Sequence, residues 1–274
     1  MPYLEIEIPA SSELHEILIA ELSFNNYDSF QEQEDQLMAY ILEEDFSEEV
    51  LKDILSRYNV TNSFKVSTLE NKNWNEEWEK NFDPITVNDD CYVRATFHEE
   101  KGVPYEIIIN PRMTFGTGHH STTQLMMRTQ FDINHEGKTV IDAGCGTAVL
   151  AVLAKKLRAS TVSGNDIDEW AYENALENCK LNDCHDINIA QGTAEEVFDA
   201  GNQVDILLAN INKNVLLSEL DFYSQLVKSG GQLLLSGFYE KDIEDIAKKA
   251  SSVGFTKLSY KTLNAWACIL FDRQ

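Results

Sequence analysis

The stretch VIDAGCGTAVLAVLAKK (140–156) joins an apolar strand to a helix through a turn that contains glycine. The turn holds Gly144 and Gly146, and Asp142 stands just before them. Glycine at such a junction lets the chain turn tightly and lets a ligand approach the backbone without a Cβ in the way. A strand, a glycine turn and a helix in this order predict an open α/β sheet with a ligand at the turn.

The spacing of glycines and acids around this turn indicates which ligand binds. A third glycine, as in dinucleotide-binding turns, would fall at Val149, which is bulky, so a pyrophosphate is disfavoured. Asp166 ends the next predicted strand, where its carboxylate can accept hydrogen bonds from both ribose hydroxyls of an adenosine. An adenosine without a phosphate clamp, beside an acidic turn, points to S-adenosylmethionine. Asp142 would contact its cationic part, directly or through water, or would instead cap the nearby turn.

From about residue 90 onward, apolar strands alternate with helices. This order predicts a mostly parallel sheet that is covered by helices on both faces. The last two strands, FTKLSYKTL and AWACILF, have no helix between them, so one of them is expected to pair antiparallel. The segment LLANIN (207–212) ends the fourth strand, which brings Asn210 to the carboxyl edge where ligands bind. Its amide would orient an incoming amine or serve as a turn residue.

The segment MTFGTGHHSTTQL (113–125) allows three interpretations. Its glycines could cradle a phosphate, its histidines could bind a metal, or it could wall another ligand site. Adjacent His119 and His120 point in different directions on most backbones, and no third ligand follows at a zinc-like spacing. We therefore expect no metal site, while the phosphate and wall interpretations stay open at this point.

Residues 1–68 follow a different pattern: strand, helix, strand, strand, helix, strand. This is the order of a small ferredoxin-like α+β domain, a fold that hosts many functions and so identifies none. Residues 69–88 are expected to form a linker helix that ends before Pro84, with one aromatic face. That face would pack on a neighbouring domain or anchor a partner, and it consists of Trp74, Trp78 and Phe82. Residues 89–274 would then form the cofactor-binding domain.

Composition restricts the class of protein. The 274 residues are 43% hydrophobic, which is enough for a packed core. No apolar run reaches the length of about 18 residues that a membrane span needs, and the first residues lack the pattern of a secretory signal. The five cysteines form no C-x-x-C pair and suit free thiols in the cytoplasm. The net charge of −24 disfavours direct binding of nucleic acid and favours a basic partner, although it also serves plain solubility.

Several motifs, in their order along the chain, resemble one family. They are NWNEEWEKNFDP, FGTGHHSTT, VIDAGCGTAVLA, GNDID, LLANI and LLLSGF. The chain is similar over nearly its whole length to the bacterial methyltransferases that act on protein eleven of the large ribosomal subunit. This resemblance implies a class I, Rossmann-like methyltransferase domain with a mostly parallel seven-stranded sheet and an antiparallel edge. It also implies that the small N-terminal domain recognises the protein substrate.

The resemblance also carries over residues and a reaction. It implies methyl transfer from S-adenosylmethionine to lysine or N-terminal amines of the ribosomal protein, with Asn210 and His120 as the candidate catalytic residues. The family's contacts with the cofactor carry over to Thr123, Gly144, Asp166 and Asn210. The other expected contacts are Asp142 and Gly146 of the glycine turn, and Phe115 and Gly116 in a wall over the methionine end of the cofactor. Five positions depart from the family's usual Gly, Ala, Pro and Ser-Gly, and these are Arg112, Thr114, Ser121, Thr147 and Ala148.

Two other functions remain open at this level. One is methylation of a small molecule on the same fold, which would leave the N-terminal domain without a use. The other is an acidic adaptor that has lost catalysis, which the intact residues around the predicted site disfavour. We expect a monomer whose partner is a basic ribosomal protein, either free or in the ribosome, with no bound nucleic acid and no membrane.

Overall fold

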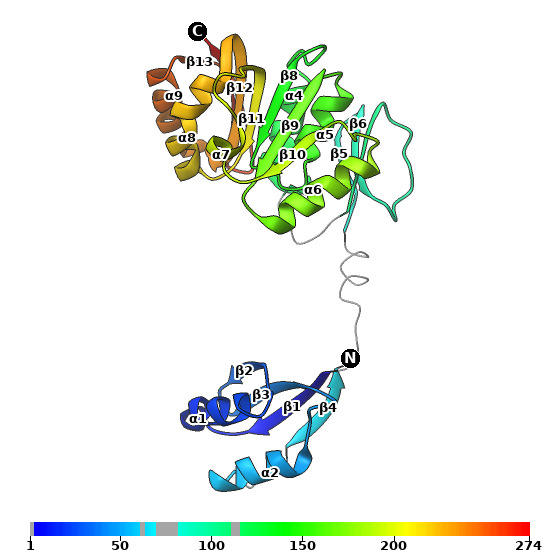
Figure 1. The fold of residues 1–274 in the computed structure, drawn as a ribbon, viewed down its shortest axis with the longest axis vertical. Coiled ribbons are helices and arrows are strands. Elements are labelled where there is room, and N and C mark those ends of the chain that lie inside the picture. The colour runs from blue at the N-terminus through cyan, green and yellow to red at the C-terminus, as the bar shows by residue number, and fades with distance from the viewer. Residues whose placement is uncertain (1–2, 61–63, 70–81, 111–115) are drawn as a thin grey trace. The chain divides into compact units, whose positions relative to one another are not determined.

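The computed structural model describes residues 3–60, 64–69, 82–110 and 116–274, and the chain divides into two compact units (Figure 1). The first unit spans Met1–Asn81 and the second spans Phe82–Gln274. Each unit is described by itself. Of the predicted aromatic linker, residues 70–81 lie outside the described residues, which include Phe82 as a buried side chain of the second unit.

The first unit has the strand and helix order expected for a ferredoxin-like domain. Its antiparallel sheet has the order β2-β3-β1-β4. The central strands β1 and β3 alternate buried and half-exposed residues, so one face meets the helices and forms a core around Ile6, Leu18 and Leu51. Its elements are β1 (Tyr3–Pro9), α1 (Ser12–Ser23), β2 (Ser29–Gln33), β3 (Gln36–Leu42), α2 (Glu48–Arg57) and β4 (Lys65–Leu69).

The second unit is built on a seven-stranded sheet of order β10-β9-β8-β11-β12-β14-β13, which confirms the predicted fold class. The pairs from β10 through β12 are parallel, and only β14 runs antiparallel to its neighbours β12 and β13. The strands are β8 (Thr139–Ala143), β9 (Thr161–Asp166), β10 (Asn188–Gln191), β11 (Val204–Asn210), β12 (Val227–Tyr239), β13 (Phe255–Leu263) and β14 (Trp266–Arg273).

Helices cover both faces of this sheet and create two separate cores. One core packs α4, α5 and α6 against the sheet, and the other packs α8 and α9 against the opposite face (Figure 1). The helices are α4 (Ser121–Gln130), α5 (Val149–Lys156), α6 (Glu169–Leu181), α7 (Ala194–Val197), α8 (Lys213–Leu226), the 3₁₀ turn η1 (Glu240–Asp242) and α9 (Ile243–Ser252). Among the described residues, no helix is long and apolar enough to cross a membrane.

A second, three-stranded sheet begins earlier than the sequence indicated. Its strands are β5 (Ile85–Asn88), β6 (Cys91–Ala95) and β7 (Tyr105–Ile109), and they pair in this order. The predicted linker therefore ends too late, since β5 already belongs to the second unit. The segment YEIIINP indicates a strand and forms β7, whereas β5 and β6 were not expected, and the sheet is stabilised by packing on α4, α5 and α6.

Candidate functional site

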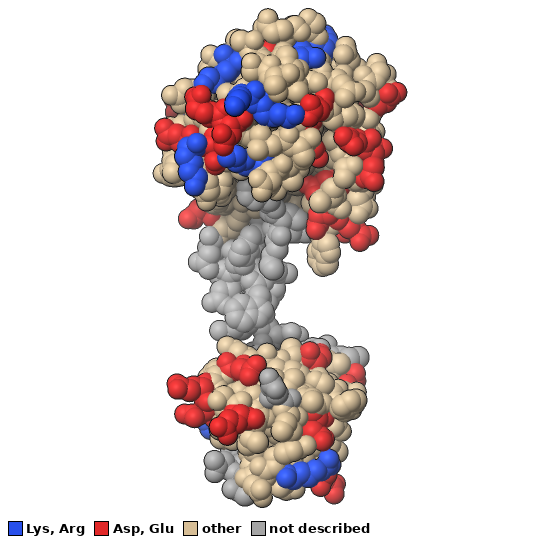
Figure 2. Space-filling model, turned by 90° about the vertical axis from the view of Figure 1, so that its left-hand side faces the viewer, with Lys and Arg blue, Asp and Glu red and all other residues tan. Residues whose placement is uncertain are grey.

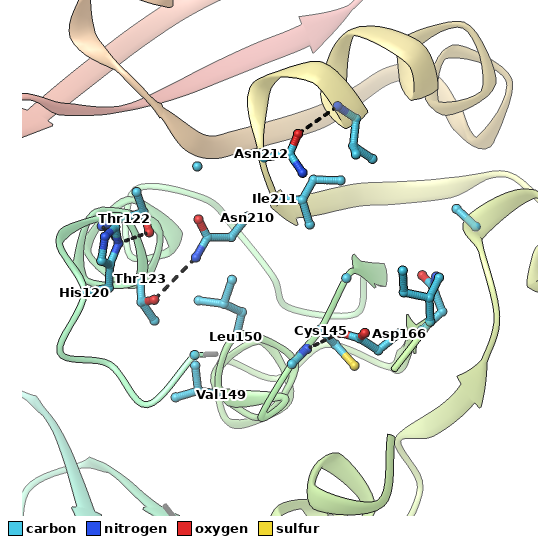
Figure 3. A pocket seen from close by; sticks show the side chains of 18 of the residues that line it. His120, Thr122, Thr123, Cys145, Val149, Leu150, Asp166, Asn210, Ile211 and Asn212 are labelled. Atoms are coloured by element: carbon cyan, nitrogen blue, oxygen red, sulfur yellow. Dashed lines mark hydrogen bonds between the residues drawn. The ribbon is translucent and has the colours of Figure 1, made fainter. Parts of the chain in front are cut away.

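A cavity of about 460 Å³ lies at the carboxyl edge of the seven-stranded sheet (Figure 3). Parallel strands end together at this edge, so residues far apart in sequence meet there. Helix α4 covers one side of the cavity, and the first turns of α8 cover another. Seven of the predicted site residues lie in its wall, and these are Gly116, His120, Thr123, Gly144, Gly146, Asp166 and Asn210. Phe115 lies outside the described residues.

Asp166 is held by the backbone at the tip of β9. One carboxylate oxygen accepts from the Gly146 N–H at 2.9 Å, and the other accepts from the Asp168 N–H at 3.1 Å. Each oxygen has a further lone pair, so the carboxylate can still accept two hydroxyl groups. Asp168 has a different task, because its side chain caps α6 by accepting from the Ala171 N–H. This geometry fits a ribose whose two hydroxyls meet Asp166.

Two glycines allow the chain after β11 to close over the floor of the cavity. Gly144 has φ 67°, and a Cβ there would overlap the Ile211 side chain. Gly237 has φ 98°, and a Cβ there would overlap the Ile211 carbonyl. Both backbone angles are strained for other residues. The LLLSGF segment therefore needs its glycine so that the strand end carrying Asn210 stays in place.

Asp142 lies behind the cavity wall and not in it. The side chain is fully buried, and its Oδ2 accepts from the Ala151 N–H, the third residue of α5, at 3.1 Å. Its Oδ1 has no hydrogen-bond partner among the described residues. Burial, together with the smaller effect of the neighbouring Asp166 charge, raises the pKa of this carboxyl to about 7, although the hydrogen bond from the Ala151 N–H lowers it. Of the two roles considered for Asp142, the geometry fits a cap, although of α5 rather than of the turn.

Ala148 explains why α5 relies on this distant cap. It stands at the N-cap position with φ 61° and provides no side-chain hydrogen bond. This left-handed conformation suits the glycine that the resembled family usually has there, and it costs a non-glycine residue about 1–2 kcal/mol. The departure at this position therefore alters local strain and leaves the shape of the turn intact.

Asn210 reaches the cavity with a fixed amide orientation. Its Nδ2 donates to Thr123 Oγ1 at 3.3 Å, as the dashed line in Figure 3 marks. Its Oδ1 is buried and has no partner among the described residues. A buried carbonyl oxygen without a donor is costly, so this atom is a ready acceptor for a ligand N–H group.

His120 lies in the wall as the N-cap of α4. Its Nδ1 accepts from the Thr122 N–H at 3.3 Å and lies 2.7 Å from Thr122 Oγ1. Because Nδ1 uses its lone pair in this way, the proton of the neutral ring is on Nε2. Burial lowers the pKa of the ring, which favours the neutral form. In this state the imidazole donates through Nε2, so the geometry favours a structural role over that of a general base.

The two histidines do not converge on one point. His119 contacts Asp83 O through Nε2 at 2.9 Å and Thr117 Oγ1 through Nδ1 at 3.3 Å. In the part of the chain that the structure describes, no three His, Cys, Asp or Glu side chains form a group that could hold a metal ion.

The charged residues of the cavity wall distinguish a phosphate ligand from a cationic one. Asp166 and Glu219 lie in the described wall of the cavity, and no Lys or Arg does. An acidic wall disfavours a phosphate and favours a cation. S-adenosylmethionine carries a sulfonium and an ammonium group, so the charges, the ribose acceptor and the free Asn210 Oδ1 all fit it.

Glu219 and Trp266 are among the cavity residues that sequence reasoning missed. Glu219 follows Asn212 and Val215 at helical spacing along α8, so all three face the cavity. This spacing was the available signal for Glu219, which also accepts from the Tyr223 hydroxyl. Trp266 begins β14, and its place beside the strand ends follows only from the antiparallel pairing with β12.

Comparisons with known proteins agree with this site. The family model "Ribosomal protein L11 methyltransferase (PrmA)" matches residues 6–274. A ribosomal protein L11 methyltransferase of Bacteroides fragilis is 40% identical over 281 residues, covering 99% of each chain. One of Porphyromonas gingivalis is 41% identical over 265 residues, covering 94% of this chain and 90% of its own.

A solved structure shows the same fold. The ribosomal protein L11 methylase of Lactobacillus delbrueckii subsp. bulgaricus superposes with a TM-score of 0.66 and 24% identity, covering 70% of this chain and 100% of its own. The family model and the relatives above both extend over nearly the whole length of this protein. The chain therefore belongs to the ribosomal protein L11 methyltransferase family.

Proposed function

We propose that this protein transfers methyl groups from S-adenosylmethionine to lysine or N-terminal amines of ribosomal protein L11. The observation that carries the proposal is the pairing of family membership over residues 6–274 with a cavity that fits a cationic adenosine ligand. Within that cavity, Asn210 Oδ1 offers an unused acceptor to an amine.

S-adenosylmethionine, when bound, supplies a methyl group on a good leaving group, so the chain's own residues mainly have to align and desolvate the reactants. The amine must arrive neutral, with its lone pair free. One of its N–H groups donates to Asn210 Oδ1, which turns the lone pair toward the methyl carbon. The nitrogen–carbon bond forms as the sulfur–carbon bond breaks, and the resulting ammonium then loses a proton to solvent.

Asn210 also stabilises the positive charge that forms on the amine nitrogen during methyl transfer. Positive charge develops on the nitrogen during transfer, and a carbonyl oxygen next to it is stabilising. Thr123 maintains the required amide orientation, because a rotated amide would present its N–H groups to the amine instead. His120 has its Nδ1 engaged by Thr122, so we assign it to positioning α4 and not to proton removal.

The first unit is proposed to hold the protein substrate. Residues 1–69 contain 15 Asp and Glu against 3 Lys and Arg, so a quarter of the chain carries half of the net charge of −24. Figure 2 shows these acidic side chains on the visible face of the unit. A concentration of one charge sign steers an oppositely charged partner and raises its association rate. Ribosomal proteins bind an RNA backbone, which makes basic surfaces the expected complement.

We further propose that the enzyme works as a monomer in the cytoplasm, on L11 that is either free or assembled in the ribosome. Every cysteine is buried and free, which is compatible with a reducing compartment.

The direct test is incubation of the purified protein with S-adenosylmethionine and purified L11, followed by mass spectrometry of intact L11 and its peptides. We expect stepwise mass increases of one methyl group on lysine or N-terminal residues, at a rate more than tenfold lower with the Asn210→Ala variant. Methylation of small amines but not of L11 would favour a small-molecule enzyme. Calorimetric binding of S-adenosylmethionine without any transfer would favour an adaptor.

A further inference from the structure

Trp266 is placed at the cavity by the hairpin that joins the last two strands. Only two residues separate Leu263 and Trp266, and both have left-handed backbones, with φ 50° at Asn264 and φ 66° at Ala265. Two such residues are typical of the tight turn whose twist matches a β-hairpin. Because β14 is antiparallel to β12, its first residue lies at the edge where the parallel strands end. The half-buried indole thus becomes part of the cavity wall.

Two aromatic neighbours hold the indole. Tyr239 is the register partner of Trp266, and their rings stack with centroids 4.2 Å apart at 27°. The His120 ring meets Trp266 at 70° with centroids 4.7 Å apart. Stacked and edge-on pairs of this kind restrict the rotation of both rings. Trp266 is therefore a stiff wall and not a mobile side chain at the rim.

The strand order places Trp266 away from the expected adenosine position. Asp166 ends β9, whereas Trp266 starts β14, with β8, β11 and β12 between them. Neighbouring strands lie about 4.8 Å apart, so Trp266 is two strand spacings, or about 10 Å, from Asn210 on the side opposite Asp166. The mechanism above puts the amine at Asn210. The Trp266 end of the cavity therefore offers the chain that carries the amine a route that avoids the ribose end.

A second hollow begins on the other side of the aromatic pair. It is lined by Tyr239, Glu240, Lys241 and Ala265, and among these Tyr239 stacks directly on Trp266. The Tyr239–Trp266 stack thus lies between the cofactor cavity and a more open depression. A long side chain that enters from the depression would pass along the indole before reaching Asn210.

We propose that Trp266 is a positioning residue for the acceptor side chain in the methyl transfer described above. The methylene groups of the acceptor pack against the indole, which lowers the freedom of a flexible chain and holds its nitrogen in line at Asn210. Trp266 and Asp166 line opposite ends of one cavity, with three strands between them, so we expect a change at Trp266 to act on the acceptor more than on the ribose end of the cofactor. The inference rests on the proposed function and adds a packing surface for the lysine side chains among its acceptors.

The test compares Trp266→Ala and Trp266→Phe with the wild type on L11. For Trp266→Ala we expect kcat to fall at least tenfold, with KM for L11 and Kd for S-adenosylmethionine each within threefold of the wild type. The proposed docking of L11 on the first unit and the ribose contact at Asp166 do not involve Trp266. The substitution should therefore affect only the alignment of the acceptor amine. Trp266→Phe retains an aromatic wall that can stack on Tyr239 and should recover kcat to within threefold.

Two further variants separate positioning from folding. Tyr239→Ala keeps the indole of Trp266 but removes the ring that stacks on it. We therefore expect kcat to fall, but by a smaller factor than in Trp266→Ala. Tyr260→Ala removes an exposed aromatic ring of β13, outside the cavity, and should behave as the wild type. Thermal unfolding of each variant shows whether the fold is kept.

The positioning role of Trp266 and the proposed function are tested by different results. Wild-type kcat in Trp266→Ala, or a loss of cofactor affinity equal to the loss of kcat, would overturn the positioning role. A wild-type protein that transfers no methyl group to L11 would instead overturn the proposed function. Activity of the wild type on L11 tests the proposed function. The comparison of the variants with the wild type then tests the positioning role.

Discussion

Asn210 and Thr123, 87 positions apart, form a buried hydrogen bond from Nδ2 to Oγ1 at 3.3 Å. The bond joins the end of β11 to the first turn of α4 and decides which end of the amide faces a ligand. It leaves Asn210 Oδ1 as the acceptor, which is the polarity that an incoming amine requires.

Removing either partner should lower turnover more than cofactor affinity. We expect Asn210→Ala to reduce kcat by more than tenfold, since removing one preorganised group that stabilises charge in a transition state costs about 10²–10³ in kcat. Thr123→Val keeps the shape but releases the amide, so its loss should be smaller. Thr129→Val is the matched control, because that hydroxyl donates to Leu125 O on the same helix and lies outside the cavity wall. Methylation assays on L11 measure kcat, and calorimetric titration measures the affinity for S-adenosylmethionine. An equal loss of kcat and affinity would contradict this assignment.

Asp166 and Asp168 provide a paired test of the ribose site. Asp166→Ala should weaken binding of S-adenosylmethionine, because hydrogen bonds to a charged group contribute about 1.5–3 kcal/mol each. Asp168→Ala should leave affinity intact and lower stability by about 0.5–2 kcal/mol, since it removes the cap of α6. Isothermal titration and thermal unfolding of both variants separate the two effects. Unchanged affinity in Asp166→Ala would remove this carboxylate from the cofactor site.

Asp142 should make stability depend on pH in an unusual direction. Its pKa is raised from 3.8 to about 7, mainly by burial. Below 3.8 the carboxyl is protonated in both the folded and unfolded chains, and between the two values only the unfolded chain releases the proton. The folded state therefore loses stability as pH rises through this window, at up to about 1.4 kcal/mol per pH unit, and the loss is complete above pH 7.

The Asp142→Asn variant isolates this contribution, because the amide oxygen can still accept from the Ala151 N–H without titrating. The stability of the variant relative to the wild type should rise with pH from about 4 to 7 and then level off. Urea unfolding at a series of pH values measures the difference. A difference that stays constant across this range would show that Asp142 is ionised throughout.

A chain that begins at residue 69 should separate cofactor binding from substrate docking. It retains every described cavity residue and the two cores of the second unit, so affinity for S-adenosylmethionine should be unchanged. Methylation of L11 should fall steeply, because the first unit no longer raises the local concentration of the acceptor. Equal rates for the truncated and intact chains would assign the first unit to another partner or to folding.

The sequence by itself determined the framework of the second unit. The glycine turn between β8 and α5 and the alternation of apolar strands with helices are local patterns that a few residues specify. The carboxyl ends of parallel strands share one edge, so Asp166 and Asn210 could be assigned to the same cavity from their positions alone. The absence of a helix before AWACILF likewise predicted the antiparallel strand.

Only the tertiary structure decided what each side chain at that edge does. Asp142 is close to Gly144 in sequence, but it lies under the turn and caps α5 rather than facing the cavity. The orientation of the Asn210 amide depends on Thr123, and the place of Trp266 depends on the pairing of β14 with β12. The physical reason is common to these cases: periodicity and turn chemistry act over neighbouring residues, whereas burial and hydrogen-bond partners are set by contacts between distant parts of the chain.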